Sequence, residues 1–424
     1  GHPAQSFVEH RLANGLDVIL HEDHTTPIVT INVLYHVGSK NEQRGRTGFA
    51  HLFEHLMFDG SLHVPRGGYD LHCTSVGGDN NAFTNADITD YFITLPREQL
   101  ALGLWLESDR MAEFAIQEIS LETQKSVVLE EKRQTSDDAP YGDLTQVMAE
   151  LAFDHEHPYS WDTIGIEDDV RAATMTDVRD FYQRFYLPSN ATIVIGGDFD
   201  SDEAMRLVHG YFGSIPAGAA FDRPQPNPAQ HHYGMRRRVE SHIIPFNAAF
   251  LGYHTPGIYD NDIYALELLV TILADGESSR LYRALEYDQE IASETECFIE
   301  EGELGSTMFI YAIGQTADVT PEQLEKALRD EIAGVVKDGV TERELQKAKN
   351  RKLTVVVNAL QSISTRTERL AFYKALYNDP ALAFSEASLY ENITTDDIQR
   401  VAQRWLANVE PNVVEYVASS KFEA

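Results

Sequence analysis

The 424-residue sequence predicts an α+β fold made of two similarly folded halves, each an antiparallel sheet with helices packed on one face. Three observations lead to this prediction. The chain is longer than one hydrophobic core usually supports. A segment of its first half recurs in its second half. Within each half, β-like runs are grouped apart from long stretches of helical periodicity, which is typical of α+β domains.

The internal repeat sets the expected domain boundaries. Residues 177–185 read DVRDFYQRF, and residues 397–405, which lie 220 positions later, read DIQRVAQRW. Both copies have the pattern of the end of an amphipathic helix, and both lead through an Asn into a β-like run. Residues 215–232 have the Pro, Gly and Ala content of a linker. We therefore expect a first domain over residues 1–218 and a homologous second domain over residues 235–424.

The individual elements follow from residue type and periodicity. β-branched and aromatic residues mark the strands, and helical periodicity dominates residues 97–187 in the first half and residues 342–376 in the second. The expected strands are residues 27–39, 87–96, 190–199, 247–255, 306–314 and 412–418.

Composition narrows the possible functions. Hydrophobic residues make up 43% of the chain, which indicates a globular protein. A net charge of −33 would repel a phosphate backbone, so we expect no nucleic-acid partner. No apolar run is long enough to predict a membrane span. Cys73 and Cys297 are the two cysteines and show no CxxC spacing, so any metal site must use His and carboxylate ligands.

The stretch GFAHLFEHLMFDGS, residues 48–61, predicts a metal site on an amphipathic helix. His51 and His55 are four residues apart and share one helix face, and they suit zinc as neutral imidazoles. Glu54 lies between them and can take a proton from an attacking water. The plainer interpretation is a pair of core histidines, but a carboxylate on this apolar helix would be costly without a partner.

A zinc site of this kind needs a further ligand from another element. The segment SLETQKSVVLEEKRQ, residues 120–134, predicts a helix that carries the carboxylates Glu130 and Glu131. Either residue could also belong to a solvated helix face, since Lys132 and Arg133 follow directly.

With these motifs the chain resembles the pitrilysin-type (M16) zinc metallopeptidases, a family that includes mitochondrial processing peptidase and insulin-degrading enzyme. The order His-x-x-Glu-His is the inverted zinc motif of that group. The resemblance implies a Glu ligand 76 residues after the second His, and that position is Glu131. Glu130 would point about 100° away on the helix. The resemblance also covers LANGLDVIL (12–20), NNAFTNADITDYF (80–92), HPYSWDTIG (157–165) and SSRLYRALE (278–286).

The family implies how a substrate is held. An unstructured peptide adds as a strand to a sheet edge near an Asn-Ala pair, which matches Asn81 and Ala82. An ordinary Asn-rich turn is the plainer interpretation of this stretch. The implied activity is hydrolysis of peptides by a zinc endopeptidase, with Zn²⁺ held by His51, His55 and Glu131.

Two departures from the family pattern suggest an incomplete active site. Active members carry an Arg and, seven residues later, a Tyr in the second half or in a partner subunit. Glu286 and Ser293 stand at those positions here, and Arg280 and Tyr287 have the spacing but not the register. We therefore expect a heterodimer with a second M16-like subunit that supplies the Arg/Tyr pair. The second departure is Gln124, at a position where the family often has a Glu.

Two alternative functions stay open at this point. One is a non-catalytic structural subunit, like the core proteins of the respiratory cytochrome complex. The other is a presequence-processing subunit, for which only Asp143 offers an acidic contact after the expected third ligand.

His155 and His157 are expected in a surface loop. The chain begins at Gly1 without a basic-then-apolar leader, and together with the acidic composition this leads us to expect a periplasmic protein.

Overall fold

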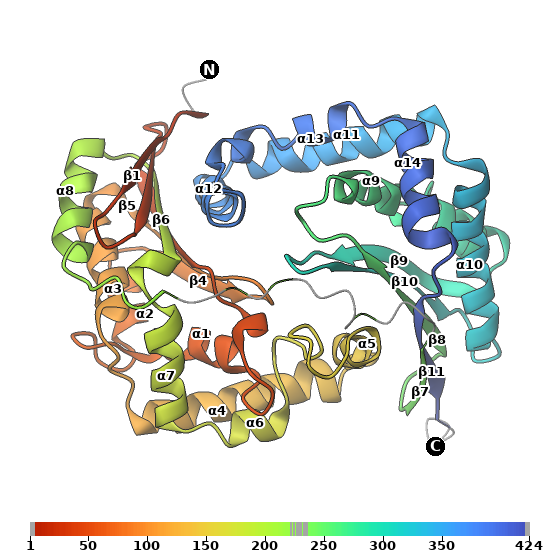
Figure 1. Cartoon of the computed structure of the whole chain (residues 1–424), viewed down its shortest axis with the longest axis horizontal. Helices are drawn as coiled ribbons and strands as arrows, with labels where there is room; N and C mark the ends of the chain where they lie inside the picture. The colour runs from red at the N-terminus through yellow and green to blue at the C-terminus, as the bar shows by residue number, and fades with distance from the viewer. Residues whose placement is uncertain (1–4, 221–222, 224, 226–230, 232–235, 420–424) are drawn as a thin grey trace. The chain divides into compact units, whose positions relative to one another are not determined.

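A computed structural model describes residues 5–220, 223, 225, 231 and 236–419. Within these residues the chain forms two compact units (Figure 1). Unit 1 comprises residues 5–132, 162–223 and 356–386, and unit 2 comprises residues 133–161, 224–355 and 387–419. The predicted boundaries at 218 and 235 follow the two sequence halves, whereas the compact units exchange one segment each. Part of the predicted linker lies outside the described residues.

Unit 1 is built on a six-stranded sheet in the order β1-β2-β6-β3-β5-β4. Its strands are β1 (Val8–Arg11), β2 (Asp17–Glu22), β3 (Ile28–Tyr35), β4 (Asp79–Thr84), β5 (Thr89–Pro96) and β6 (Ala191–Gly197). Its helices are α1 (Phe49–Asp59), α2 (Gly68–Ser75), α3 (Leu100–Ala112), α4 (Glu118–Lys132), α6 (Glu167–Arg171), α7 (Met175–Phe185), α8 (Ser201–Phe212) and α12 (Ile363–Tyr377).

Unit 2 is built on a five-stranded sheet in the order β7-β11-β8-β10-β9. Its strands are β7 (Arg237–His242), β8 (Ala248–Thr255), β9 (Ala292–Glu300), β10 (Ser306–Gly314) and β11 (Asn412–Ala418). Its helices are α5 (Leu144–Ala152), α9 (Asp262–Ala274), α10 (Pro321–Asp338), α13 (Ser388–Glu391), α14 (Thr395–Ala402) and most of α11 (Glu342–Ala359). Short 3₁₀ or π segments are η2 (Ser39–Asn41), η3 (Arg97–Gln99), η4 (Arg133–Asp137), η5 (Pro188–Asn190), η7 (Tyr282–Asp288), η8 (Pro380–Phe384) and η9 (Gln403–Ala407).

The two sheets repeat one topology, which confirms the predicted α+β fold with two similar halves. β6 lies between β2 and β3 in unit 1 as β11 lies between β7 and β8 in unit 2. The pairs β2/β6 and β7/β11 are parallel, and the other pairs are antiparallel. Each sheet is thus mostly antiparallel, as predicted, and contains one parallel pair.

Helices cover both faces of each sheet rather than one. In unit 1, α3 packs on the face that includes Ile31, because Gly103 lies against that side chain. The opposite face receives α12, whose Thr367 lies against Gly196 of β6. In unit 2, Val147 and Met148 of α5 pack on the face away from α9 and α10. The sequence prediction missed the second layer because each unit takes it from the other half of the chain.

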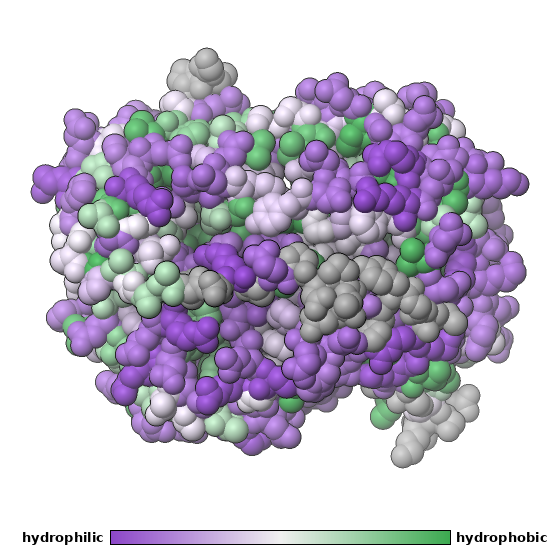
Figure 2. All heavy atoms as spheres, in the orientation of Figure 1, coloured by the Kyte–Doolittle hydropathy of each residue, from purple (hydrophilic) through white to green (hydrophobic). Residues whose placement is uncertain are grey.

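The exterior is strongly polar, as the composition requires. Figure 2 shows hydrophilic residues over most of the face in view. No helix in the described part of the chain is both long and apolar enough to cross a membrane. Cys73 and Cys297 are both buried as free thiols.

Candidate active site

Helix α1 carries the predicted motif and is held by its apolar side. Leu52, Phe53, Leu56 and Met57 are at most 3% exposed and belong to the core of unit 1. Full burial of side chains of this size contributes roughly 1.5–3 kcal/mol each. The remaining face of α1 presents the two histidines and the glutamate of the motif, all of them partly buried.

Opposite charges fix the two ends of α1. At the N-terminus, the Glu42 carboxylate accepts hydrogen bonds from the backbone N–H groups of Gly48, at 2.9 Å, and Ala50, at 2.7 Å. At the C-terminus, the buried Arg110 guanidinium donates to the Met57 carbonyl at 3.3 Å. Both charges match the helix dipole. Gly48 has φ +82°, and a Cβ there would come within 2.7 Å of the Ile164 carbonyl, so glycine is required at this position.

The arginine at the end of α1 is itself held in a buried network. Glu107 accepts from two of its nitrogens, at 2.6 and 3.0 Å. The guanidinium carbon lies 4.4 Å from the ring centroids of Tyr69 and Tyr91. A buried charge needs such partners to offset its loss of hydration. The last turn of α1 is therefore tied to α2, α3 and β5.

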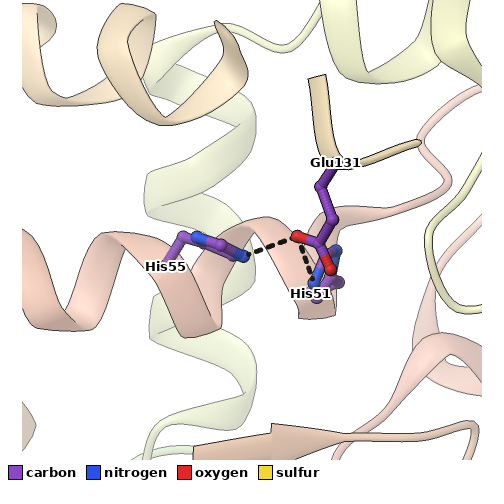
Figure 3. Close-up of side chains that lie close together, drawn as sticks. All are labelled: His51, His55 and Glu131. Atoms are coloured by element: carbon purple, nitrogen blue, oxygen red, sulfur yellow. Dashed lines mark ion pairs between the residues drawn. The ribbon is translucent and has the colours of Figure 1, made fainter. Parts of the chain in front are cut away.

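Helix α4 packs against α1 and brings Glu131 to the two histidines (Figure 3). The Glu131 Oε2 atom lies 3.2 Å from His55 Nε2 and 3.5 Å from His51 Nε2. One ligand atom from each residue lies within 4.8 Å of the others. It is the one such group of metal-binding side chains within the described residues. The neighbouring Glu130 is exposed.

The chemistry of these three donors suits zinc. Burial lowers the pKa of His51 to about 4, although Glu131 opposes this shift, so the imidazole is neutral at pH 7. Two neutral imidazole nitrogens and one carboxylate oxygen are a usual ligand set for catalytic zinc, which keeps a fourth position for water.

Glu54 lies on the same helix as the two histidines, and its carboxylate accepts a hydrogen bond from β4. Burial raises the pKa of its carboxyl, and this effect is partly offset by a hydrogen bond from Thr84 and by the charge of His55. The Thr84 hydroxyl donates to Glu54 Oε2 at 2.5 Å. A partly buried carboxyl with a raised pKa beside a metal-binding group has the properties of a general base or acid.

The predicted substrate-binding pair lies on the edge strand of the same sheet. Asn81 and Ala82 belong to β4, and within the described part of the chain β5 is the one strand that is hydrogen-bonded to β4. Asn81 is exposed, and its Oδ1 accepts from the backbone N–H of Ala82 at 2.8 Å. An open edge is where an extended peptide can add as a strand.

The residues at the expected Arg/Tyr positions are engaged within unit 2. Glu286 accepts a hydrogen bond from Thr295 at 2.7 Å, and Ser293 donates to the Gly314 carbonyl at 3.2 Å. Arg280 makes a two-pronged pair with Glu344, at 2.8 and 2.9 Å, which gives that arginine a structural partner.

His155 and His157, which the sequence predicts in a surface loop, lie in different surroundings. His155 is exposed beside Glu156, whereas His157 is 1% exposed and stacks on Phe153. The prediction of a surface loop therefore holds for His155, and for His157 it is wrong because the aromatic side chains around it bury the ring.

Sequence reasoning missed three residues that shape the site: Glu42, Thr84 and Arg110. The contacts of these residues with α1 do not follow the spacing of a helix or of a strand, so no periodicity in the sequence indicates them. Thr84 belongs to the stretch NNAFTN, residues 80–85, but nothing in that stretch indicates which side chain contacts Glu54.

Comparison with known families places the chain in one group. The model described as "Insulinase (Peptidase family M16)" matches residues 17–157, which include the whole candidate site. The model described as "Peptidase M16 inactive domain" matches residues 172–352. Together the two matches span most of the chain.

Individual relatives agree with the family match. Zinc protease PqqE of Helicobacter pylori is 29% identical over 407 residues, which cover 95% of this chain and 91% of PqqE. A zinc protease of Mycobacterium tuberculosis, Rv2782c, is 27% identical over 96% of this chain and 92% of its own length. The crystal structure of a protease from Helicobacter pylori superposes with a TM-score of 0.89 at 28% identity, over 97% of this chain and 99% of that chain.

One solved structure is similar in fold and longer. The periplasmic protease PqqL from Escherichia coli superposes with a TM-score of 0.78 at 23% identity. The match covers 98% of this chain but 48% of the PqqL chain.

Proposed function

The chain belongs to the M16 (insulinase) family of zinc proteases, and we propose that it hydrolyses unstructured peptides with His51, His55 and Glu131 as zinc ligands and Glu54 as the catalytic base. The observation that carries this proposal is the convergence of the two imidazole Nε2 atoms on one Glu131 oxygen beside Glu54. When bound, zinc would act as a Lewis acid that polarises the peptide carbonyl and lowers the pKa of a water, which can then lose a proton and attack at neutral pH.

Glu54 moves the proton in the proposed reaction. Its carboxylate takes a proton from the attacking water and passes it to the leaving nitrogen of the peptide. The raised pKa of the buried carboxyl suits this double role, because a stronger base accepts the proton more readily. His51 stays neutral and therefore keeps its lone pair for the metal.

We propose that the substrate binds along β4 near Asn81 and Ala82. The open edge of β4 supports this placement, and backbone hydrogen bonds there would hold a peptide with little demand on its sequence. Such a mode suits an endopeptidase that acts on extended segments rather than on folded proteins.

We further propose that activity requires a second M16-like subunit carrying the Arg/Tyr pair. Glu286 and Ser293 cannot provide cationic and phenolic contacts, which supports this requirement. The length of PqqL also supports it, since this chain corresponds to about half of that protein. A periplasmic location is part of the same proposal, and the periplasmic PqqL is its support.

The catalytic part of the proposal is tested with Glu54→Gln. We expect the variant and the wild type each to bind one zinc per chain, and we expect the variant to cleave a quenched-fluorescence peptide about 10²-fold more slowly or worse, since general-base catalysis contributes at least that much. Zinc is measured by atomic emission and cleavage by fluorescence. An unchanged rate would remove Glu54 from the reaction.

The partner requirement is tested by assaying the purified chain alone and mixed with an M16-like chain that carries the Arg/Tyr pair. We expect zinc in both samples and turnover only in the mixture. Full turnover by the chain alone would contradict the partner requirement. A chain that binds no zinc would instead favour the structural-subunit alternative.

A further inference from the structure

A single side-chain contact joins the proposed base to the edge strand. Thr84 is the last residue of β4, and its hydroxyl donates to Glu54 Oε2 at 2.5 Å. Both side chains are partly buried. We propose that Thr84 is a positioning residue, whose hydroxyl holds one carboxylate oxygen of Glu54 so that the other faces the reacting water. This inference rests on the proposed function.

The register of β4 directs Thr84 toward α1. Thr84 pairs with Thr89, and Ala82 pairs with Tyr91. Side chains alternate along a strand, so Thr84 and Ala82 lie on the same face. Ala82 packs against the core that contains α1, which identifies that face. A shift by one residue would turn the hydroxyl to the opposite side of the sheet.

The turn that follows Thr84 is firmly anchored. Asn85 Oδ1 accepts from the backbone N–H groups of Asp87 and Ile88, at 2.8 and 2.9 Å. Lys40 Nζ pairs with Asp87 at 3.2 Å, and the two side chains are 1% and 9% exposed. The Ser39 N–H donates to the Asn85 carbonyl at 3.1 Å. The turn is therefore bound to the segment at residues 38–42.

The same segment also holds the helix that carries Glu54. Glu42 accepts from the first turn of α1, as described above. Gly38 allows the close approach of the turn, because a Cβ there would lie 2.4 Å from the Asn85 carbonyl. Residues 38–42 therefore contact both the turn that follows Thr84 and the first turn of the helix that carries Glu54.

The bond has a chemical consequence for Glu54. A hydrogen bond to an ionised oxygen is short and strong, so Oε2 is occupied and Oε1 is left to exchange protons with water and substrate. Without the hydroxyl, the carboxylate can rotate and offer either oxygen in several orientations. Orientation of a catalytic group contributes directly to the rate.

The test compares Thr84→Val, which keeps the shape but loses the hydroxyl, with Thr84→Ser, which keeps the hydroxyl. We expect the Val variant to lower kcat about 10-fold, the effect of losing one charge-assisted hydrogen bond, and to leave KM and zinc affinity unchanged. We expect the Ser variant to stay within about 2-fold of wild type, since it keeps that hydrogen bond.

A second comparison separates positioning from a structural role. In a Glu54→Asp background the shorter side chain no longer meets Thr84, so adding Thr84→Val should lower the residual rate no further. A structural defect would lower the rate in both backgrounds, and that result would overturn the inference.

A binding measurement provides a readout besides activity. A tripeptide hydroxamate carries a zinc-binding group with a polar hydrogen that a properly oriented Glu54 carboxylate can accept. By calorimetry on zinc-loaded protein we expect Thr84→Val to weaken it about 5-fold and Thr84→Ser to leave it unchanged, in proportion to the lost hydrogen bond. Equal affinity and equal rate in the Val variant would overturn the inference. A fully active Glu54→Gln variant would instead overturn the proposed function itself.

Discussion

Helices α1 and α9 occupy the same place in the two units but carry different chemistry. α1 follows β3 as α9 follows β8. Glu54 is the sixth residue of α1, and Glu267 is the sixth residue of α9. At the positions of His51 and His55, α9 has Tyr264 and Leu268. The acid is present in both helices, and only one helix has the histidines.

The partners of the two acids differ in the same way. Glu54 receives a hydrogen bond from Thr84 at the end of β4, whereas Glu267 interacts with Glu301, which directly follows β9. α4 brings the carboxylate of Glu131 to α1, and its counterpart α11 brings the cation of Lys352 toward Glu267. Both units therefore place a partly buried acid at this position, and the candidate metal site of unit 1 is distinguished by a few side chains around it.

The largest expected effect comes from making α1 resemble α9. His55→Leu copies Leu268 and removes one of the three proposed zinc donors, so we expect zinc affinity to fall by at least about 10²-fold and peptide cleavage to be lost. The leucine suits the apolar helix, and the fold should remain. Zinc titration and circular dichroism measure the two outcomes. A variant that retains zinc with wild-type affinity would show that His55 is not a ligand.

The exchanged helices give a second contrast. In unit 1, Arg366 of α12 pairs with Asp23 at 2.8 Å, and both side chains are 6% exposed. In unit 2, Glu150 of α5 pairs with Arg238 at 2.7 Å, and both are 37% exposed. We expect Arg366→Met to lower the free energy of unfolding of unit 1 by about 3–5 kcal/mol. Arg238→Met should cost unit 2 below about 1 kcal/mol.

Urea unfolding at several pH values measures the difference in destabilisation between Arg366→Met and Arg238→Met. Burial opposes the shift, but hydrogen bonds from Thr25 and Arg366 lower the pKa of Asp23 from 3.8 to about 2. The stabilisation by the Asp23 carboxylate is therefore present above pH 3.8 and lost as the pH falls toward 2. Equal destabilisation by the two Met substitutions at pH 7 would mean that burial does not distinguish the pairs.

The smallest effect is expected at Glu267. Burial, together with the neighbouring Glu301, raises the pKa of its carboxyl above the ordinary 4.5. The folded state thus holds the proton more tightly, and this contribution to stability is complete below pH 4.5 and decreases as the pH rises toward the raised pKa. Glu267→Gln removes this titration and should therefore make the free energy of unfolding of unit 2 less dependent on pH between 5 and 8. Cleavage by the variant should match wild type, and a loss of activity would give Glu267 an unexpected role.

Local patterns predicted six of the eleven strands that the structure describes. β-branched runs identified β3, β5, β6, β8, β10 and β11, because strand periodicity is a property of neighbouring residues. The helical tract at residues 342–376 is two helices, α11 and α12, because the chain turns at Gln361 and Ser362 before α12 begins.

Long-range relations could not be predicted from those patterns. The exchange of α5 and α12 depends on which sheet a helix covers, and an amphipathic face does not specify its partner. The same limit applies at the site. The spacing of His51 and His55 is local, and the position of Glu131 came from a family resemblance. Glu42 contacts α1 from the loop before it and Arg110 contacts it from α3, and no helical or strand periodicity links either residue to α1.

The exchange of segments also determines when each sheet can be completed during synthesis. The sheet of unit 1 is missing α12 until the ribosome has delivered residues 356–386, although its last strand, β6, ends at Gly197. Until then the face around Thr30 and Gly196 lacks its cover, and exposed faces of this kind are where nascent chains associate wrongly. Unit 1 therefore cannot be completed until residues 356–386 have been synthesised. A fragment that ends at the linker would leave this face of the sheet uncovered and would be expected to bind chaperones.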